Sequence, residues 1–299
     1  MIKLLLIILI FNLIIGQSEK SNKVYLDSLL NISKFNNINT KYNTILGRDN
    51  DPKKTTDISK AKLFSRKIGW SILTSPGLRF LTKYLYPKST KSHFNVKNAV
   101  AFTIDDGFCG IDNINGCMID EIRELLNSYN AHATFFISGS HCINASIDQV
   151  NKLINDGHEI ANHNMMDWSY KEYTLEEFEF DLLLTKQILT LYNQEYSSWY
   201  RAPMGELSIN MQKIINKHKM NHVVSDAFAH DTAIPDPIWI SNYVLNKTTH
   251  GSIILIHMPE KDVREWNYKA IELTLKGLQE KNMSILNLSE INDLEKESN

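Results

Sequence analysis

The chain has 299 residues, of which 43% are hydrophobic and 22% charged, and its formal net charge is −2. This composition is typical of a globular protein and excludes a disordered, fibrous or repetitive chain. A near-neutral charge without a basic stripe argues against a nucleic-acid-binding protein. Three cysteines are too few for a fold built on disulfides.

The first residues are typical of a secretory signal peptide. Lys3 gives a positive start, residues 4–15 form an apolar run broken by Asn12, and small or polar residues follow. The run is shorter than the ~20 apolar residues that span a membrane. We expect residues 1–18 to be removed and the protein to be secreted to the cell exterior or cell wall, without a stable membrane span. The alternative is an uncleaved N-terminal anchor.

Asn-x-Ser/Thr sequences are candidates for glycosylation in a secreted protein. Such sequences start at Asn31, Asn144, Asn246, Asn282 and Asn287. Asn287 stands in an apolar stretch, which argues against its modification.

The cysteines at positions 109, 117 and 142 can form one disulfide in an oxidising compartment, which leaves one free thiol. The sequence leaves three pairings open. The short loop between Cys109 and Cys117 favours that pair.

Residues 19–96 show no clear period and are expected to form an N-terminal extension. They are rich in Asn, Lys, Ser and Thr up to about Ser59, and apolar residues then recur at helical spacing from Ala61 to Tyr86. We expect a polar lead-in followed by short helices.

From Asn98 onward, apolar strand-like runs alternate with amphipathic stretches. The expected strands cover 100–104, 133–137, 159–161, 199–201, 222–224, 253–256 and 283–288. The expected helices cover 119–129, 147–154, 208–217 and 266–280, together with one that a Thr174–Glu177 capping box opens and that runs to about Tyr192. This alternation predicts a parallel α/β architecture, either an open sheet or a barrel. Residues 291–299 are expected to form a polar tail.

Polar residues stand where these strands end, and active sites of parallel α/β folds gather on that face. They are Asp105, Asp106, His163, Arg201, Asp226 and His257. The adjacent Asp105 and Asp106 suit a divalent ion, because one carboxylate can ligate while the other acts as a base. The alternative is a pair of solvated acids at a strand end.

His163 and Asp167 are four residues apart, so on a helical turn both could bind one ion. His257 ends the most apolar strand, where a general acid could lie, and Arg201 could hold a carboxylate. Each of these residues also has an ordinary structural explanation: a surface or core pair, a buried core histidine, or a structural salt bridge.

Taken in chain order, four motifs resemble those of the polysaccharide deacetylases, carbohydrate esterase family four, which includes chitin and peptidoglycan deacetylases. The motifs are residues 103–107 (TIDDG), 163–167 (HNMMD), 201–205 (RAPMG) and 255–257 (LIH). Supporting matches lie at 133–137 and 157–160. The resemblance covers about residues 97–288 and makes 97–290 the expected catalytic domain.

The resemblance implies a distorted (β/α) barrel that removes N-acetyl groups from an N-acetylglucosamine polymer such as chitin and releases acetate. It also implies one divalent metal ion, usually zinc. The implied roles are a general base (Asp105), metal ligands (Asp106 and His163), a residue that orients the base (Arg201), an oxyanion donor (the Met204 N–H) and a general acid (His257). An acidic residue that precedes His257, either Asp231 or Asp226, would hold the imidazole.

The chain departs from the family pattern at Asp167, which stands where the family has a second histidine ligand. Two carboxylates and one imidazole lower the net charge of the site, so Co²⁺, Mn²⁺ or Fe²⁺ also become candidates. Asp167 as a non-ligand remains open. So do a catalytically disabled carbohydrate-binding or wall protein, and a hydrolase of another amide or O-acetyl ester.

Two smaller departures are Phe108, where the family has Pro, and Met204, where Tyr is frequent. We expect both to border the pocket and to affect its shape. The sequence gives no prediction of the oligomeric state.

Overall fold

The computed structural model describes residues 59–74, 86, 89–110, 113, 115–192 and 197–298. The expected signal peptide, the polar lead-in to residue 58 and the sequon at Asn31 lie outside the described residues. The helical spacing expected from Ala61 is confirmed by α4 (Lys60–Leu73), which Ser59 caps by accepting the backbone N–H of Lys62. Residues 75–85 of that stretch lie outside the described residues.

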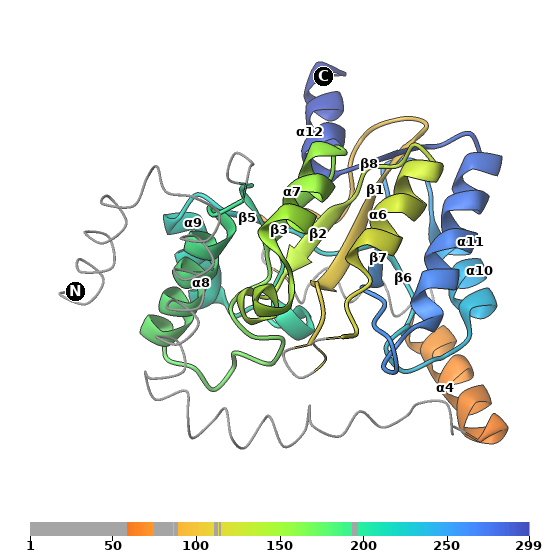
Figure 1. Cartoon of the computed structure of the whole chain (residues 1–299), viewed down its shortest axis with the longest axis horizontal. Helices are drawn as coiled ribbons and strands as arrows, with labels where there is room; N and C mark the ends of the chain where they lie inside the picture. Colours follow the sequence, from red (N-terminus) through yellow and green to blue (C-terminus); the bar gives the residue numbers. More distant parts are fainter. Residues whose placement is uncertain are drawn as a thin grey trace.

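The strands of the described chain form one parallel sheet in the order β5-β4-β3-β2-β1-β7-β6, and β8 pairs with β1. The sheet curls into a half-barrel with helices around it (Figure 1). Its strands are β1 (Ala99–Gly107), β2 (Thr134–Ile137), β3 (Glu159–Asn162), β4 (Trp199–Tyr200), β5 (Asn221–His222), β6 (Ala227–Phe228), β7 (Ile253–His257) and β8 (Ser284–Leu286). The predicted parallel α/β fold is confirmed.

The α-helices after α4 connect successive strands or follow the last one. They are α6 (Ile119–Ser128), α7 (Ile147–Asn155), α8 (Leu175–Leu189), α9 (Ile209–Lys217), α10 (Pro237–Lys247), α11 (Trp266–Glu280) and α12 (Leu288–Glu297). The capping box that opens α8 is present as predicted, with the Thr174 side chain accepting the Glu177 N–H. The short strand β6 and the helix α10 were not predicted.

Residues 291–297, within the stretch expected to be a polar tail, continue α12, and Ile291 is fully buried. The side chain of Asn287 caps this helix by accepting the backbone N–H of Glu290, and its own N–H group donates to the Gly157 carbonyl. An amide used in this way is a poor glycan acceptor, which agrees with the expectation for this sequon.

Successive side chains of a strand point to opposite faces of the sheet, and they pack into two hydrophobic clusters. Val100 and Phe102 of β1 pack toward the helices, whereas Ala99 and Ala101 lie in an inner cluster on the other face of the sheet. Because successive side chains point to opposite faces, Thr103 and Asp105 follow Ala101 onto the inner face. The same period places His163 after Ala161 and His257 after Ile253 on that face. The site is therefore built on the concave side of the half-barrel.

The helix α4 packs beside α10 through polar contacts. Arg66 donates to the carbonyl of Ala233, Lys67 pairs with Asp236, and Trp70 packs edge-on against Phe228 and His230. In Figure 1 it lies near the side of the barrel where the strands end. None of the described helices has the length and apolar character required to cross a membrane.

The cysteine pair favoured by the short loop is present: Cys109 and Cys117 are joined, and Cys142 is free and buried. The disulfide closes the loop that follows β1.

Candidate active site

Asp105 and Arg201 form a buried ion pair at the ends of β1 and β4. Arg201 Nη1 donates to Asp105 Oδ1 at 2.6 Å and to Thr103 Oγ1 at 2.8 Å. The guanidinium also lies 4.2 Å from the centre of the Phe136 ring. These contacts fix the orientation of Asp105 and leave its second oxygen for another partner, which suits a base.

His257 and Asp231 form a second pair, across the site on β7. Asp231 Oδ1 lies 2.9 Å from His257 Nδ1, and Asp231 Oδ2 accepts the His257 backbone N–H at 2.8 Å. Because a carboxylate holds Nδ1, Nε2 is the ring atom left for proton transfer. Of the two candidates for this role, the structure places Asp231 on His257. Asp226 instead contacts His93, Ser252 and the backbone of Ile253.

Burial favours the neutral form of His257, but the Asp231 and Asp106 carboxylates outweigh it and raise the pKa of the imidazole to about 9. His257 is therefore protonated near neutral pH, as an acid must be. Asp105 and His257 are paired residues of the adjacent strands β1 and β7, so the expected base and the expected acid stand side by side.

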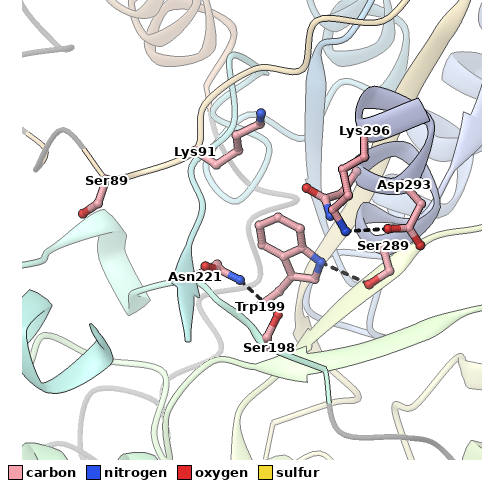
Figure 2. Close-up of a pocket in the computed structure, with 9 residues that line it drawn as sticks. Ser89, Lys91, Ser198, Trp199, Asn221, Ser289, Asp293 and Lys296 are labelled. Carbon is pink, nitrogen blue, oxygen red and sulfur yellow. Dashed lines mark hydrogen bonds and ion pairs between the residues drawn. The ribbon is translucent and has the colours of Figure 1, made fainter. Parts of the chain in front are cut away.

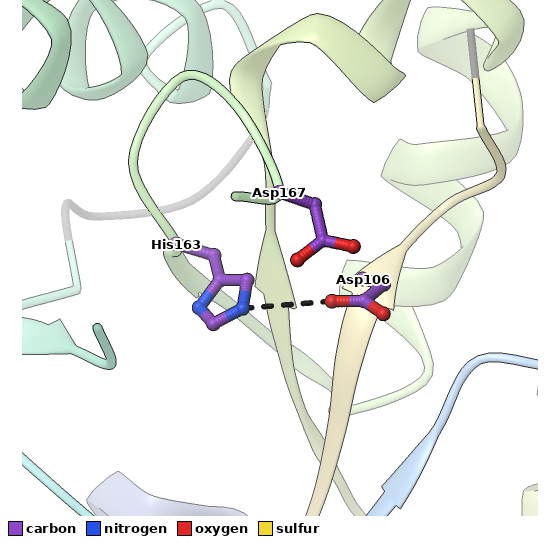
Figure 3. Close-up of side chains that lie close together, drawn as sticks. All are labelled: Asp106, His163 and Asp167. Atoms are coloured by element: carbon purple, nitrogen blue, oxygen red, sulfur yellow. Dashed lines mark ion pairs between the residues drawn. The ribbon is translucent and has the colours of Figure 1, made fainter. Parts of the chain in front are cut away.

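Asp106, His163 and Asp167 form a third group, the central group, beside these pairs (Figure 3). Each offers one ligand atom, and all of these atoms lie within 4.8 Å of one another. The predicted convergence of His163 and Asp167 occurs, but not on a helical turn. Residues 163–168 form a loop after β3, with Asn164 in the left-handed region at φ 62°.

The ligand atoms of this group fit a divalent cation. His163 Nδ1 lies 2.8 Å from the Arg201 carbonyl, which can only accept, so Nδ1 carries a hydrogen. In the neutral imidazole, the form that binds a cation, the lone pair is therefore on Nε2. Nε2 lies 3.5 Å from Asp106 Oδ1, with the Asp167 carboxylate beside them. One imidazole lone pair and two carboxylates facing one another in a buried site call for a positive charge between them.

The acidities of the two carboxyl groups differ. Burial acts to raise the pKa of Asp106, but the positive charges of Arg264, His257 and His163 hold it well below its usual range. For Asp167, burial and then the Asp106 charge raise the pKa to about 6. Asp106 is therefore ionised at neutral pH, and a cation in the site would favour the ionised form of Asp167.

The backbone is in the left-handed region at three non-glycine positions of the site. They are Asp106 at φ 57°, Asn164 at φ 62° and Met204 at φ 56°. Such residues cluster at functional sites because only a demand on side-chain or backbone direction offsets their cost. Met204, the expected oxyanion donor, lies in the short turn Pro203–Gly205 after β4, and its side chain is 63% exposed. Phe108, expected to border the pocket, is instead fully buried in the hydrophobic cluster between the sheet and the helices.

Arg264, which the sequence reading missed, contacts the site directly. Its Nη1 donates to Asp106 Oδ2 at 2.9 Å, and its Nη2 donates to Glu260 Oε1 at 3.0 Å. Arg264 lies in the turn between β7 and α11, outside the four motifs. A single arginine in a polar turn carries no sequence signal that distinguishes it from a solvated one.

A separate hollow lies at the opposite ends of the strands (Figure 2). It is lined by Trp199 and Asn221, which begin β4 and β5, and by residues of α12. Its lysines are paired, Lys91 with Glu295 and Lys296 with Asp293. It brings together none of the residues expected to take part in chemistry.

Comparison with known proteins gives a family and a fold. Residues 95–223 match the family model "Polysaccharide deacetylase". The chain is 26% identical to a peptidoglycan-N-acetylglucosamine deacetylase of Bacillus cereus over 66% of its own length and 89% of that protein. It is 25% identical to a chitooligosaccharide deacetylase of Azorhizobium caulinodans, over 58% of this chain and 80% of that one.

Among solved structures, a CE4 family pseudoenzyme from Bacillus anthracis superposes with a TM-score of 0.57 at 22% identity, over 68% of this chain and 67% of that chain. At this identity the likeness concerns the fold. The half-barrel, the order of the motifs and the match of residues 95–223 agree, and together they support assigning this part of the chain to the polysaccharide deacetylase family.

Proposed function

We propose that this protein is a metal-dependent hydrolase that removes N-acetyl groups from N-acetylglucosamine-containing polysaccharide, chitin above all, and releases acetate. Residues 97–290 would form its catalytic domain. The observation that carries the proposal is the pairing of Asp105–Arg201 and His257–Asp231 on adjacent strands, with the Asp106–His163–Asp167 group beside them. Relatives named as deacetylases of peptidoglycan and of chitooligosaccharides support the substrate class.

Asp106, His163 and Asp167 would hold one divalent ion, zinc or alternatively Co²⁺, Mn²⁺ or Fe²⁺. Such an ion supplies Lewis acidity, which polarises a carbonyl and makes water more acidic.

The remaining residues bind, orient and move protons. Asp105, oriented by Arg201, accepts a proton from the attacking water through its free oxygen. The backbone N–H of Met204 donates to the oxygen that becomes negative as the acetyl carbon turns tetrahedral. His257 Nε2 gives its proton to the departing amine, while Asp231 stabilises the imidazolium and fixes the ring.

The variant Asp105→Asn tests the proposal, because it keeps the shape of the side chain and removes the base. We expect acetate release from N-acetylglucosamine oligomers to fall by about 10²-fold or more, with the fold intact. Asp120→Asn, on the exposed face of α6, is the matched control and should retain full activity. Full activity of Asp105→Asn would contradict the assignment.

A second candidate is a carbohydrate-binding protein without catalysis. Asp167 in place of a histidine favours it, and the solved relative described as a pseudoenzyme belongs to this fold. Both proton-transfer pairs argue against it, since a binding protein needs neither. Binding of chitin oligomers without acetate release at any metal loading would favour the second candidate. Release from O-acetyl esters but not from N-acetyl sugars would instead change the substrate.

Secretion and glycosylation are part of the proposal. The signal-like start supports export, and Asn246 and Asn282 are exposed, as glycan acceptors must be. Asn144 is half-buried and its side chain donates to the Gly110 carbonyl, so it suits a glycan less well. Secretion from a eukaryotic host, followed by mass spectrometry of the wild type and of Asn246→Gln and Asn282→Gln, would test both points. A cytosolic, unprocessed product would contradict them.

A further inference from the structure

Arg264 is held from three sides. Besides its bonds to Asp106 and Glu260, its Nε donates to the carbonyl of Met258 at 2.7 Å. Its side chain is 12% exposed, and those of Asp106 and Glu260 are 4% and 5% exposed. A buried guanidinium with each of its three nitrogens bonded to a different acceptor has a single orientation.

Glu260 fixes the far side of this arrangement to the loop that follows β1. Its Oε2 accepts the Gly110 backbone N–H at 3.0 Å and the Asn113 amide at 3.2 Å. Glu260 also forms a backbone bridge with Cys117, one end of the disulfide. The guanidinium is therefore tied to a covalently closed loop as well as to its own turn.

The contact divides the Asp106 carboxylate between two partners. Oδ2 is bound by Arg264, and Oδ1 faces His163 Nε2. A carboxylate held by a buried cation through one oxygen presents the other in a fixed direction. Asp106 can therefore offer one oxygen, not two, toward His163 and Asp167.

Arg264 also balances a charge. A site with one carboxylate and two imidazoles carries one negative charge, whereas Asp106, His163 and Asp167 together carry two. The positive charge of the Arg264 guanidinium, bonded to Asp106, brings the net charge of the site back to that of a site with one carboxylate.

We propose that Arg264 is a positioning residue of the metal site: it holds Asp106 as a one-oxygen ligand and offsets the second carboxylate, Asp167. The inference rests on the proposed function only in taking this group as a cation site. It adds to the site a residue that none of the four motifs contains.

The test measures metal binding and not turnover alone. The affinities of metal-stripped wild type, Arg264→Gln and Arg264→Lys for Zn²⁺ and Co²⁺ are compared by competition with a chromophoric chelator. Loss of a partner that orients a metal ligand typically weakens binding about 10–100-fold, and we expect this loss for Arg264→Gln. Arg264→Lys keeps the positive charge but not the three hydrogen-bonding nitrogens of the guanidinium, so its loss of metal affinity should be smaller.

Two further measurements separate positioning from general damage. The visible spectrum of the Co²⁺-loaded Gln variant should change, because Asp106 is then free to bind through both oxygens. Arg123→Gln is the matched control. It removes an arginine of α6 that pairs with Asp156, away from the site, and should leave the metal affinity and the spectrum unchanged. Circular dichroism of the metal-free proteins shows which variants are folded, and Arg264→Lys carries the test if Arg264→Gln is not.

An unchanged or tighter affinity in a folded Arg264→Gln protein would overturn the inference, because Arg264 would then only repel the ion. Wild type without affinity for any of these ions would overturn it as well. Because affinity is measured independently of acetate release, a wild type that binds metal but releases no acetate contradicts the proposed function alone.

Discussion

Arg201 and Asp105 form one closed ion pair on the inner face of the half-barrel, and His257 and Asp231 form another. In both, one cation meets one carboxylate inside the protein. The central group beside them differs, since Asp106 and Asp167 face a single imidazole. The outer pairs are therefore complete in the protein itself, whereas the centre has a surplus of negative charge that a bound cation would remove.

This difference separates the two parts of the proposed reaction. The charges of the proposed base and acid are balanced inside the protein, whereas the proposed role of the central group requires an ion. Variants of the centre should therefore remove metal and activity together, whereas variants of the outer pairs should remove activity and leave metal in place.

The largest effect is expected from His163→Ala, which deletes the only imidazole of the central group. Loss of an ion that contributes several kcal/mol to the transition state corresponds to about 10⁴-fold slower acetate release. Metal content by atomic spectrometry should fall in parallel. His132→Ala, a half-exposed histidine paired with Glu290, is the control and should retain metal and activity. A metal-free but active His163→Ala protein would contradict the comparison.

A smaller loss is expected from His257→Ala, since general acid catalysis typically contributes about 10²–10⁴-fold. Its metal content should equal that of the wild type, because the His257 imidazole is not part of the central group. Loss of metal together with activity would place His257 in the centre and not in an outer pair.

The pH dependence of activity tests the role of His257 as the general acid. His257 acts while protonated, so with its pKa raised to about 9 activity should be lost as the pH rises through that value. Asp231→Asn removes the carboxylate that contributes most to raising this pKa, so the alkaline limb of kcat/KM should move down by at least about one unit. A limb that stays in place would show that another group titrates there.

The same shift predicts a change in stability. The folded-state pKa of His257 lies above its ordinary 6.5, so protonation stabilises the fold fully below pH 6.5. That contribution is lost between 6.5 and about 9. Denaturant unfolding across this window should show the loss in wild type and a smaller one in Asp231→Asn.

The smallest effect is expected from Asp167→His, which exchanges one ligand type for another in the same loop. We expect activity to stay within about tenfold of wild type, and the preference for Zn²⁺ over Mn²⁺ to rise because imidazole suits zinc better than manganese. Competition between Zn²⁺ and Mn²⁺ for the metal-stripped protein, followed by metal analysis, measures this preference. An unchanged preference would show that Asp167 is not a ligand.

Sequence reasoning performed well where local rules decide. The strand-like runs placed Asp105, His163 and His257 at the carboxyl ends of their strands, and the Thr174–Glu177 box marked the start of α8. It could not choose between Asp231 and Asp226, because both precede β7 and only the path of the chain after β6 brings Asp231 to His257. The helix α10 was missed because its pattern between two short strands has a weak period.

Arg264 shows a limit of a different kind. Its role comes from a turn that folds back on the end of β1 and meets Asp106, a contact between residues 158 positions apart. Neither its spacing from His257 nor its neighbours in the sequence carries that information. The helical continuation of residues 291–297 was missed for a similar reason, since Leu288, Ile291 and Leu294 pack α12 against a core formed by distant strands.

Acetate release by the purified mature protein is the most direct test of the central claim. N-acetylglucosamine oligomers would be supplied to metal-stripped protein and to protein reloaded with Zn²⁺, Co²⁺ or Mn²⁺. The account predicts no release without metal and release with at least one ion, with Asp105→Asn inactive at every loading. Folded, metal-loaded wild-type protein that releases no acetate with any ion would contradict it.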